Sequence, residues 1–201
     1  MNKALVLGLL TIVIGGFLFV LYSPGSPEAE IIQEQQNFAE AQIGELRFRY
    51  RVSPDEYQLI THDPVSQDNI VSSVSIVNAQ EYQRVVQSAT PTEYPPMIRL
   101  LQVGNPSALT PVEWARKYPE YSNGESLGSD NTASDLVVEL AGVSGITYSG
   151  EGLYRYEYYI LPHNENLYVV SGWYYEKDDN YHAEFELLKA SLQFIDQRSD
   201  A

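Results

Sequence analysis

Three arginines occupy every second position in the stretch LRFRYRV, residues 46–52. Arg47, Arg49 and Arg51 alternate with apolar residues, and a period of two is the pattern of a β-strand with one buried and one exposed face. On such a strand the three guanidinium groups share one side and lie roughly 6 to 7 Å apart. Because a guanidinium binds a carboxylate or phosphate through paired hydrogen bonds, we predict a candidate binding site for anionic groups here. The structural alternative is that each arginine neutralises an acid on a neighbouring strand.

Aromatic residues gather in a second stretch towards the C-terminus. Tyr154, Tyr156 and Tyr158 alternate along one predicted strand, and the sequence WYY at 173–175 ends the next one. Rings with polar tips are favoured at contact surfaces, so these three tyrosines are also predicted as binding residues. The structural alternative is that they pack at the edge of the core, between sheet and helix.

Other chemistries find little support in the residue pattern. The histidines at 62, 163 and 182 have no short ligand spacing, so no metal site is predicted. The acidic run at 176–179 lacks the calcium-loop pattern and is explained by a helix N-terminus, where negative charge is favoured. Ser144 has the wrong register for a nucleophile elbow. We therefore predict no catalytic residue and no cofactor, and a non-enzymatic role is favoured.

An uncharged stretch at 4–22, ALVLGLLTIVIGGFLFVLY, precedes both candidate sites. As a helix it would be roughly 28 Å long, close to the ~30 Å hydrocarbon core of a bilayer. It exceeds the apolar core of a cleaved signal peptide, and the prolines of SPGSP at 23–27 stand where a peptidase would cut. We expect a retained single-pass anchor, with cleavage as the alternative. Because Lys3 precedes the stretch and acids follow it, the N-terminus is predicted to be cytoplasmic and the C-terminal domain extracytoplasmic.

The chain beyond this stretch is strongly acidic. Of the 12 Lys and Arg residues only Lys3 lies before position 22, whereas all 27 Asp and Glu residues follow it, so the outer part has a formal charge of −16. Such a surface repels nucleic acid and anionic lipid headgroups, so neither is expected as a partner. The chain contains no cysteine, which excludes disulfides and thiol chemistry.

Patterning and turn signals predict the elements that position these residues. The clearest helix start is Thr110-Pro111-Val112-Glu113, which combines a cap, a proline at the first helical position and a glutamate that reaches back. The clearest hairpin joins strands at 153–161 and 167–175. Further strands are predicted at 46–52, 57–61, 70–77, 97–103 and 135–140, with a short helix after Asn78 and a terminal helix from about 181.

This order of elements resembles the PsbP-like fold, that of the extrinsic photosystem II protein and its bacterial relatives of unknown role. The resemblance covers about residues 46–195 and follows the segments FRYRV, YPPMIRLLQVGN, LTPVEWARKY, DLVVELAG, the long hairpin and a final helix running into SLQF. It implies an α+β domain in which an antiparallel sheet is sandwiched by helices, with no catalytic residues to carry over. It does not imply a photosynthetic role, because an anchor departs from a soluble lumenal protein and no photosystem-binding motif is present.

The sequence thus predicts four segments: a cytoplasmic tip and anchor at 1–22, a spacer with a short helix at 23–44, a PsbP-like domain at 45–196 and a tail at 197–201. The expected function is that of a membrane-anchored domain that binds or scaffolds a cell-envelope protein. The alternative is an envelope hydrolase or small-ligand-binding domain that uses a pocket between sheet and helices.

Overall fold

The computed structural model describes residues 38–52, 57–65, 68–88, 93–127, 136–177 and 179–195. All of them belong to the second of two units into which the chain divides, which begins at Gln35. The predicted anchor at 4–22 and the predicted tail at 197–201 lie outside the described residues. Among the helices that are described, none is long and apolar enough to cross a membrane.

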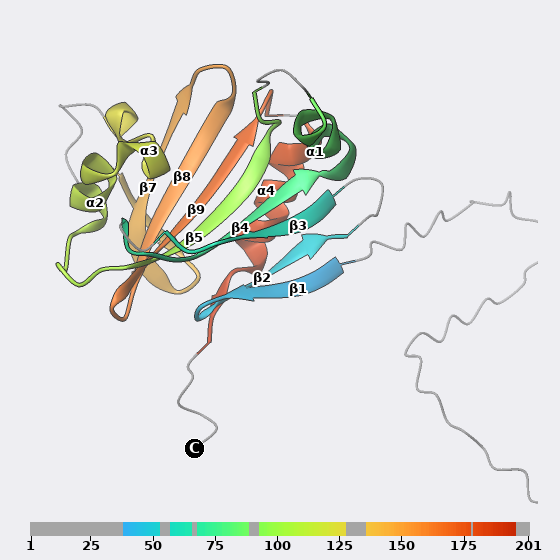
Figure 1. Ribbon diagram of the computed structural model, residues 1–201. Coiled ribbons are helices and arrows are strands. Elements are labelled where there is room, and N and C mark those ends of the chain that lie inside the picture. The colour runs from blue at the N-terminus through green and yellow to red at the C-terminus, as the bar shows by residue number, and fades with distance from the viewer. Residues whose placement is uncertain are drawn as a thin grey trace, which may run out of the picture. The chain divides into compact units, whose positions relative to one another are not determined.

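A seven-stranded antiparallel sheet forms the centre of this unit, in the order β3-β4-β5-β9-β8-β7-β6 (Figure 1). The predicted hairpin is confirmed: β8 and β9 pair from Arg155 opposite Tyr174 to His163 opposite Asn166, so its turn is shorter than predicted. The strands are β3 (Tyr57–His62), β4 (Ile70–Asn78), β5 (Met97–Gly104), β6 (Val137–Leu140), β7 (Val143–Glu151), β8 (Arg155–His163) and β9 (Asn166–Tyr174).

A second sheet consists of β1 (Phe38–Ile43), β2 (Leu46–Arg51) and the short β10 (Gln193–Phe194). The predicted alternation in β2 is confirmed for residues 46–49, because Leu46 and Phe48 are buried while Arg47 and Arg49 are exposed. At the end of the strand Tyr50 and Arg51 are both half-buried.

One expectation about this region is wrong. Residues 38–43 were expected in the spacer, where a short helix was predicted, yet they form β1 and place Ile43 in the core. The turn to β2 uses Gly44 at φ +56, a backbone conformation that glycine adopts without strain. The next strand, β3, pairs with β4 in the larger sheet.

Helices cover both faces of the larger sheet, as the sequence predicted. On one face Phe185 of α4 (Asn180–Ser191) packs with Val170, and on the other Trp114 of α2 (Pro111–Lys117) packs with Val169. Val169 and Val170 are neighbours on β9, so their side chains point to opposite faces. Figure 1 shows α2 with α3 (Pro119–Ser122) in front of the sheet and α4 behind it.

The helix starts follow the predicted caps. Thr110 and Glu113 form the reciprocal capping box at the start of α2, with the Glu113 carboxylate accepting the Thr110 amide at 2.8 Å. The Asn78 side chain accepts the amides of Gln80 and Glu81 at the start of α1 (Ala79–Val86). A 3-10 helix, η2 (Gly124–Leu127), follows α3.

Candidate functional site: an arginine groove and a tyrosine pocket

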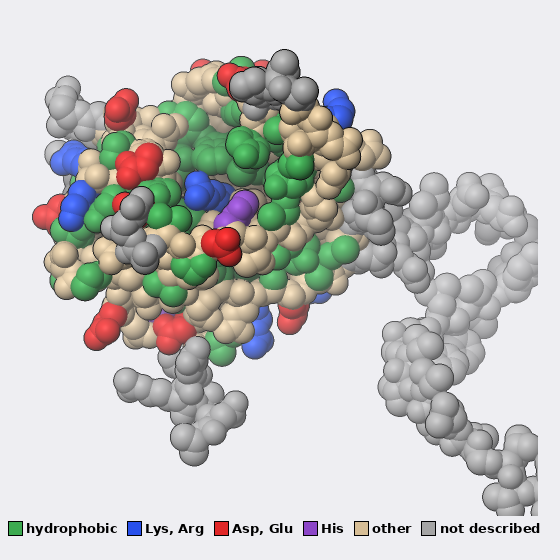
Figure 2. All heavy atoms as spheres, viewed as in Figure 1, with side chains coloured by type: hydrophobic (Ala, Val, Ile, Leu, Met, Phe, Trp, Pro, Cys, Tyr) green, Lys and Arg blue, Asp and Glu red, His purple; other side chains and the backbone are tan. Residues whose placement is uncertain are grey.

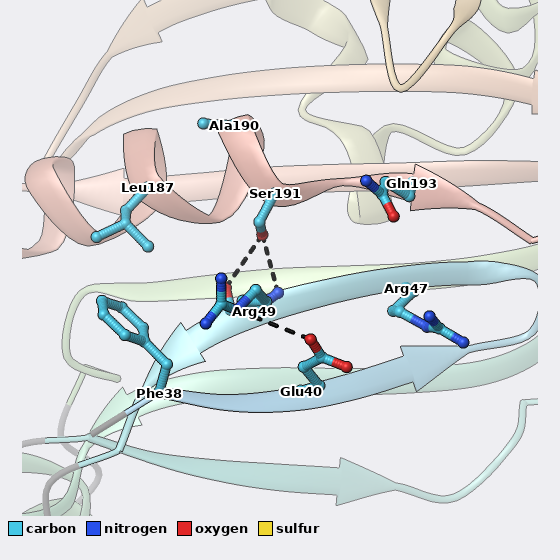
Figure 3. A pocket seen from close by; sticks show the side chains of 8 residues that line it. All are labelled: Phe38, Glu40, Arg47, Arg49, Leu187, Ala190, Ser191 and Gln193. Carbon is cyan, nitrogen blue, oxygen red and sulfur yellow. Dashed lines mark hydrogen bonds and ion pairs between the residues drawn. The ribbon is translucent and has the colours of Figure 1, made fainter. Parts of the chain in front are cut away.

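The arginine groove is a hollow of about 520 Å³ between the β1–β2 hairpin and the C-terminal end of α4 (Figure 3). Arg49 points into it, and its Nε lies 3.9 Å from the carboxylate of Glu40 on β1. The same guanidinium lies 5.5 Å from the ring centre of Phe38. Both charged side chains are more than half exposed, so this pair contributes little to stability. The groove is lined by Phe38, Glu40, Arg47, Arg49, Leu187, Ala190, Ser191 and Gln193.

Backbone hydrogen bonds fix the groove in place. The Arg49 amide donates to Ser191 Oγ at 2.8 Å, and Ser191 Oγ lies 2.7 Å from the Leu188 carbonyl of its own helix. These contacts hold β2 against the end of α4, as the dashed lines to Ser191 in Figure 3 show for Arg49. The structure therefore brings two of the three predicted arginines, Arg47 and Arg49, to one groove.

Arg51 has a different environment from the other two arginines. Its amide donates to Oε1 of Glu184 at 2.6 Å, and its Nε lies 3.6 Å from Oε2 of the same carboxylate. Glu184 is buried on α4, so Arg51 neutralises a charge inside the fold. The structural alternative therefore fits Arg51 best, while the anion-binding role of the row stays a prediction for Arg47 and Arg49.

The tyrosine pocket is a hollow of about 510 Å³ on the opposite side of the larger sheet from α4. Figure 2 shows hydrophobic side chains gathered in a hollow over the upper ends of β8, β9 and β5. All three predicted tyrosines line this pocket. They do so together with Tyr94, Met97, Trp173 and two exposed glutamates, Glu93 and Glu120.

Strand register explains how these rings meet. Tyr156 and Tyr158 are two apart on β8 and face the same side, and Trp173 on β9 stands directly opposite Tyr156. Ring centres are 5.9 Å apart for Tyr156 and Tyr158, and 6.3 Å apart for Tyr158 and Trp173. Tyr154 precedes the strand, and its hydroxyl donates to the Tyr94 carbonyl at 2.9 Å, which closes the pocket on one side.

Two tyrosines of the pocket, Tyr154 and Tyr158, have a raised pKa. Burial raises the pKa of Tyr158 above its usual value. Burial, the neighbouring Tyr175 and the carboxylates of Glu93 and Glu81 together raise the pKa of Tyr154 to about 12.

One cation lies next to the pocket without lining it. Arg99 follows Met97 by two positions on β5, on the same face, and its guanidinium lies 5.8 Å from the ring centre of Tyr121. Burial lowers its pKa, although the guanidinium stays charged. Within the described part of the chain no carboxylate forms an ion pair with it. Sequence reasoning missed Arg99, whose signal was the single charge in the largely apolar strand MIRLLQV.

A cluster formed by α4 and β8 combines metal-ligand types without fitting a metal. Ligand atoms of Glu157, His182 and Glu186 lie within 4.8 Å of one another. The ammonium of Lys189 already lies 2.7 Å from Glu186 and 3.5 Å from Glu157, so a cation of the protein balances these acids. The Tyr174 hydroxyl also donates to Glu157. The donor set therefore fits an ion-pair network.

No model of a known protein family matches the sequence, and none of the curated proteins compared with it matches either. The structure is similar to the solution structure of cyanobacterial PsbP (CyanoP) from Synechocystis sp. PCC 6803, with a TM-score of 0.48 and 12% identity over 86% of this chain and 99% of that one. It is also similar to the crystal structure of LpqN, involved in cell envelope biogenesis of Mycobacterium tuberculosis, with a TM-score of 0.37 and 13% identity over 87% of this chain and 100% of that one. A PsbP protein is thus among the structures to which this chain is similar in fold, in line with the resemblance noted in its sequence.

Proposed function

We propose that this chain is a membrane-anchored, non-enzymatic domain outside the cytoplasm, which binds a protein of the cell envelope through the tyrosine pocket. The anchor is the uncharged stretch at 4–22, and its orientation follows from Lys3 on one side and the acidic chain on the other. The observation that carries the binding role is the pocket itself, in which five aromatic rings surround a hollow of about 510 Å³.

Exposed apolar surface concentrates at this pocket. Leu153 and Tyr94 line it and are 64% and 60% exposed, and Tyr175 packs edge-on against Tyr154 with more than half of its own surface exposed. Exposed aromatic and aliphatic groups grouped around a concave site are typical of protein-binding surfaces. Tyrosine and tryptophan are also the residues that most often dominate binding energy, because a rigid ring buries a large area.

The arginine groove is the weaker candidate for the main contact. Glu40 and Glu184 already accompany two of the three arginines, so only part of the predicted positive charge is free to attract an anion. The tyrosine pocket needs no such charge, since shape, apolar surface and hydroxyl groups suffice for binding.

Site-specific photocrosslinking in cells tests the proposal. A photoreactive amino acid is placed at Leu153 of the full-length chain, and a matched probe is placed at Val137, which is 58% exposed on β6 and does not line the pocket. We expect one defined protein adduct from position 153, absent from position 137, and rebinding of that protein once purified. Equal capture from both positions, or an adduct that does not rebind, would contradict the proposal.

The pocket volume favours one second candidate function, the binding of a small ligand. A hollow of about 510 Å³ falls within the usual range of small-molecule sites. Native mass spectrometry of the purified full-length chain distinguishes the two. A bound small molecule, lost when Tyr154 is replaced by leucine, together with no protein adduct from position 153, would favour the ligand.

A further inference from the structure

We infer that the group received by the tyrosine pocket is the side-chain cation of an arginine or lysine of the bound protein. The inference rests on the proposed function and specifies the chemistry of the partner at that site. It follows from three features of the pocket: its rings, its carboxylates and the place of Arg99.

The rings supply the first feature. The pocket presents Tyr94, Tyr154, Tyr156, Tyr158 and Trp173, and among the residues that the structure describes no lysine or arginine lines it. The face of an aromatic ring carries negative charge density, so a guanidinium or ammonium above it is attracted, most strongly by tryptophan. The raised pKa values of Tyr154 and Tyr158 keep these rings as neutral phenols with hydroxyls able to donate or accept hydrogen bonds.

Two carboxylates supply the second feature. Glu93 comes from the segment before β5 and Glu120 from α3, so they reach the pocket from two different segments. Neither forms an ion pair within the described part of the chain, which leaves both able to accept hydrogen bonds from an incoming cation. The domain around them has a large negative charge, which favours the approach of a basic partner.

Arg99 supplies the third feature, because it limits how deep a cation can enter. Its half-buried guanidinium lies beyond Met97 on β5 and near Tyr158. A second positive charge is repelled from that end of the pocket. The incoming cation is therefore held at the outer end, between Glu93 and Glu120. Arg99→Gln should strengthen the binding of a cation and weaken that of an anion.

A pair of matched probes tests the charge requirement. The full-length chain in a nonionic detergent is titrated with Nα-acetyl-argininamide and with Nα-acetyl-citrullinamide, which has nearly the same shape and no charge. The indole N–H resonance of Trp173 reports on the pocket, and that of Trp114, a buried residue of α2, is the internal control. We expect the arginine probe to shift the Trp173 resonance alone and to bind about tenfold more tightly than the citrulline probe.

Two charge-neutral variants test the role of the carboxylates. Glu93→Gln and Glu120→Gln should each weaken the arginine probe about three- to fivefold and leave the citrulline probe unchanged. Glu165→Gln, in the exposed turn at the far end of the β8–β9 hairpin, is the matched control and should change neither. Equal affinity of the two probes, or no response of Trp173 to either, would overturn the inference.

Failure of this inference and failure of the proposed function give different results. If the protein captured at position 153 binds equally well to the Glu93→Gln and Glu120→Gln variants, the proposed binding function is supported and the inference of a bound cation is contradicted. If the arginine probe binds as expected and no protein is captured in cells, the cation site stands and the proposed partner is wrong.

Discussion

Glu184 on α4 holds Arg51 on β2 through two contacts, from Oε1 to the Arg51 amide at 2.6 Å and from Oε2 to its Nε at 3.6 Å. The glutamate is 1% exposed, so water does not solvate its charge, and the charge partner comes from the strand. This pair joins the terminal helix to the smaller sheet. Arg51 alternates with apolar residues on the same strand as Arg47 and Arg49, but its pairing with Glu184 gives it a different environment from theirs.

Replacing Arg51 should therefore affect stability in a way that replacing Arg49 does not. Arg51→Gln leaves a buried carboxylate without its cation and should lower the free energy of unfolding by about 2 to 3 kcal/mol, less than for a fully buried pair because Arg51 is partly exposed. Arg49→Gln removes an exposed pair and should cost less than about 0.5 kcal/mol. Urea denaturation of both variants measures the difference, and equal losses would place both arginines in the same environment.

The packing of α2 makes a second prediction. Trp114 is buried against the larger sheet beside Leu101 and Val169, so Trp114→Ala should lower the free energy of unfolding by about 3 to 5 kcal/mol. Leu153→Ala, at an exposed position, is the control and should change it by less than about 0.5 kcal/mol. Chemical denaturation followed by circular dichroism gives both values. A loss under about 1 kcal/mol for Trp114→Ala would show that α2 does not close the core.

Glu157 should make stability depend on pH. Burial raises the pKa of its carboxyl, but hydrogen bonds from Tyr174 and Tyr159 and the charge of Lys189 outweigh burial and leave the pKa below its usual value of 4.5. A carboxyl whose pKa is lower in the folded than in the unfolded chain stabilises the fold above that usual value, and the contribution disappears as the pH falls through the folded value.

Glu157→Gln should accordingly lower the Tm at pH 7, and the difference from the parent chain should narrow below about pH 4.5. Thermal unfolding at a series of pH values measures this. Glu151→Gln, at a largely exposed carboxylate, should show no such trend. A Tm difference for Glu157→Gln that is the same at pH 7 and pH 3 would mean that the network does not depend on the charge of the glutamate.

The strand β1 predicts where the chain can be shortened. A chain that begins at Gln35, the start of the second unit, keeps β1 and should be soluble and cooperatively folded. A chain that begins at Gly44 loses β1 and the buried Ile43, so its Tm should be lower by several degrees. Equal Tm values of the two shortened chains would contradict the role of β1.

The predicted anchor is tested by fractionation. The full-length chain should stay with membranes through a high-salt wash, and its release into the soluble fraction would contradict the anchor.

Sequence patterns predicted the elements whose signals are local. The capping residues of α2 and α1, the alternation of β2 and the β8–β9 hairpin each depend on neighbours in the chain, and the structure contains all of them. The β1 strand was missed because four of the six residues of FAEAQI are Ala, Glu or Gln, which favour a helix. The strand β7 (VSGITYSGE) was missed because glycines at 145 and 150 interrupt its apolar pattern.

The candidate site depended on contacts between distant residues, which one sequence does not reveal. The tyrosines at 154, 156 and 158 were predicted as binding residues, and the structure places Trp173 of the same aromatic stretch beside them and adds Tyr94 from another part of the chain. Glu184 could not be predicted as the partner of Arg51, because the pair joins residues 133 positions apart. The sequence showed the row of three arginines, but it did not show that Arg51 pairs with a buried glutamate while Arg47 and Arg49 line a groove.

The most direct test of the account is a comparison of two variants in binding the protein captured from position 153. Calorimetry with that purified protein measures the Kd of the full-length chain carrying Tyr154→Leu or Arg49→Glu, with an unchanged Tm as evidence of folding. If the tyrosine pocket is the binding surface, Tyr154→Leu weakens binding about tenfold or more and Arg49→Glu leaves the Kd within about twofold. The opposite result, with binding lost in Arg49→Glu and retained in Tyr154→Leu, would contradict the account and assign the partner to the arginine groove.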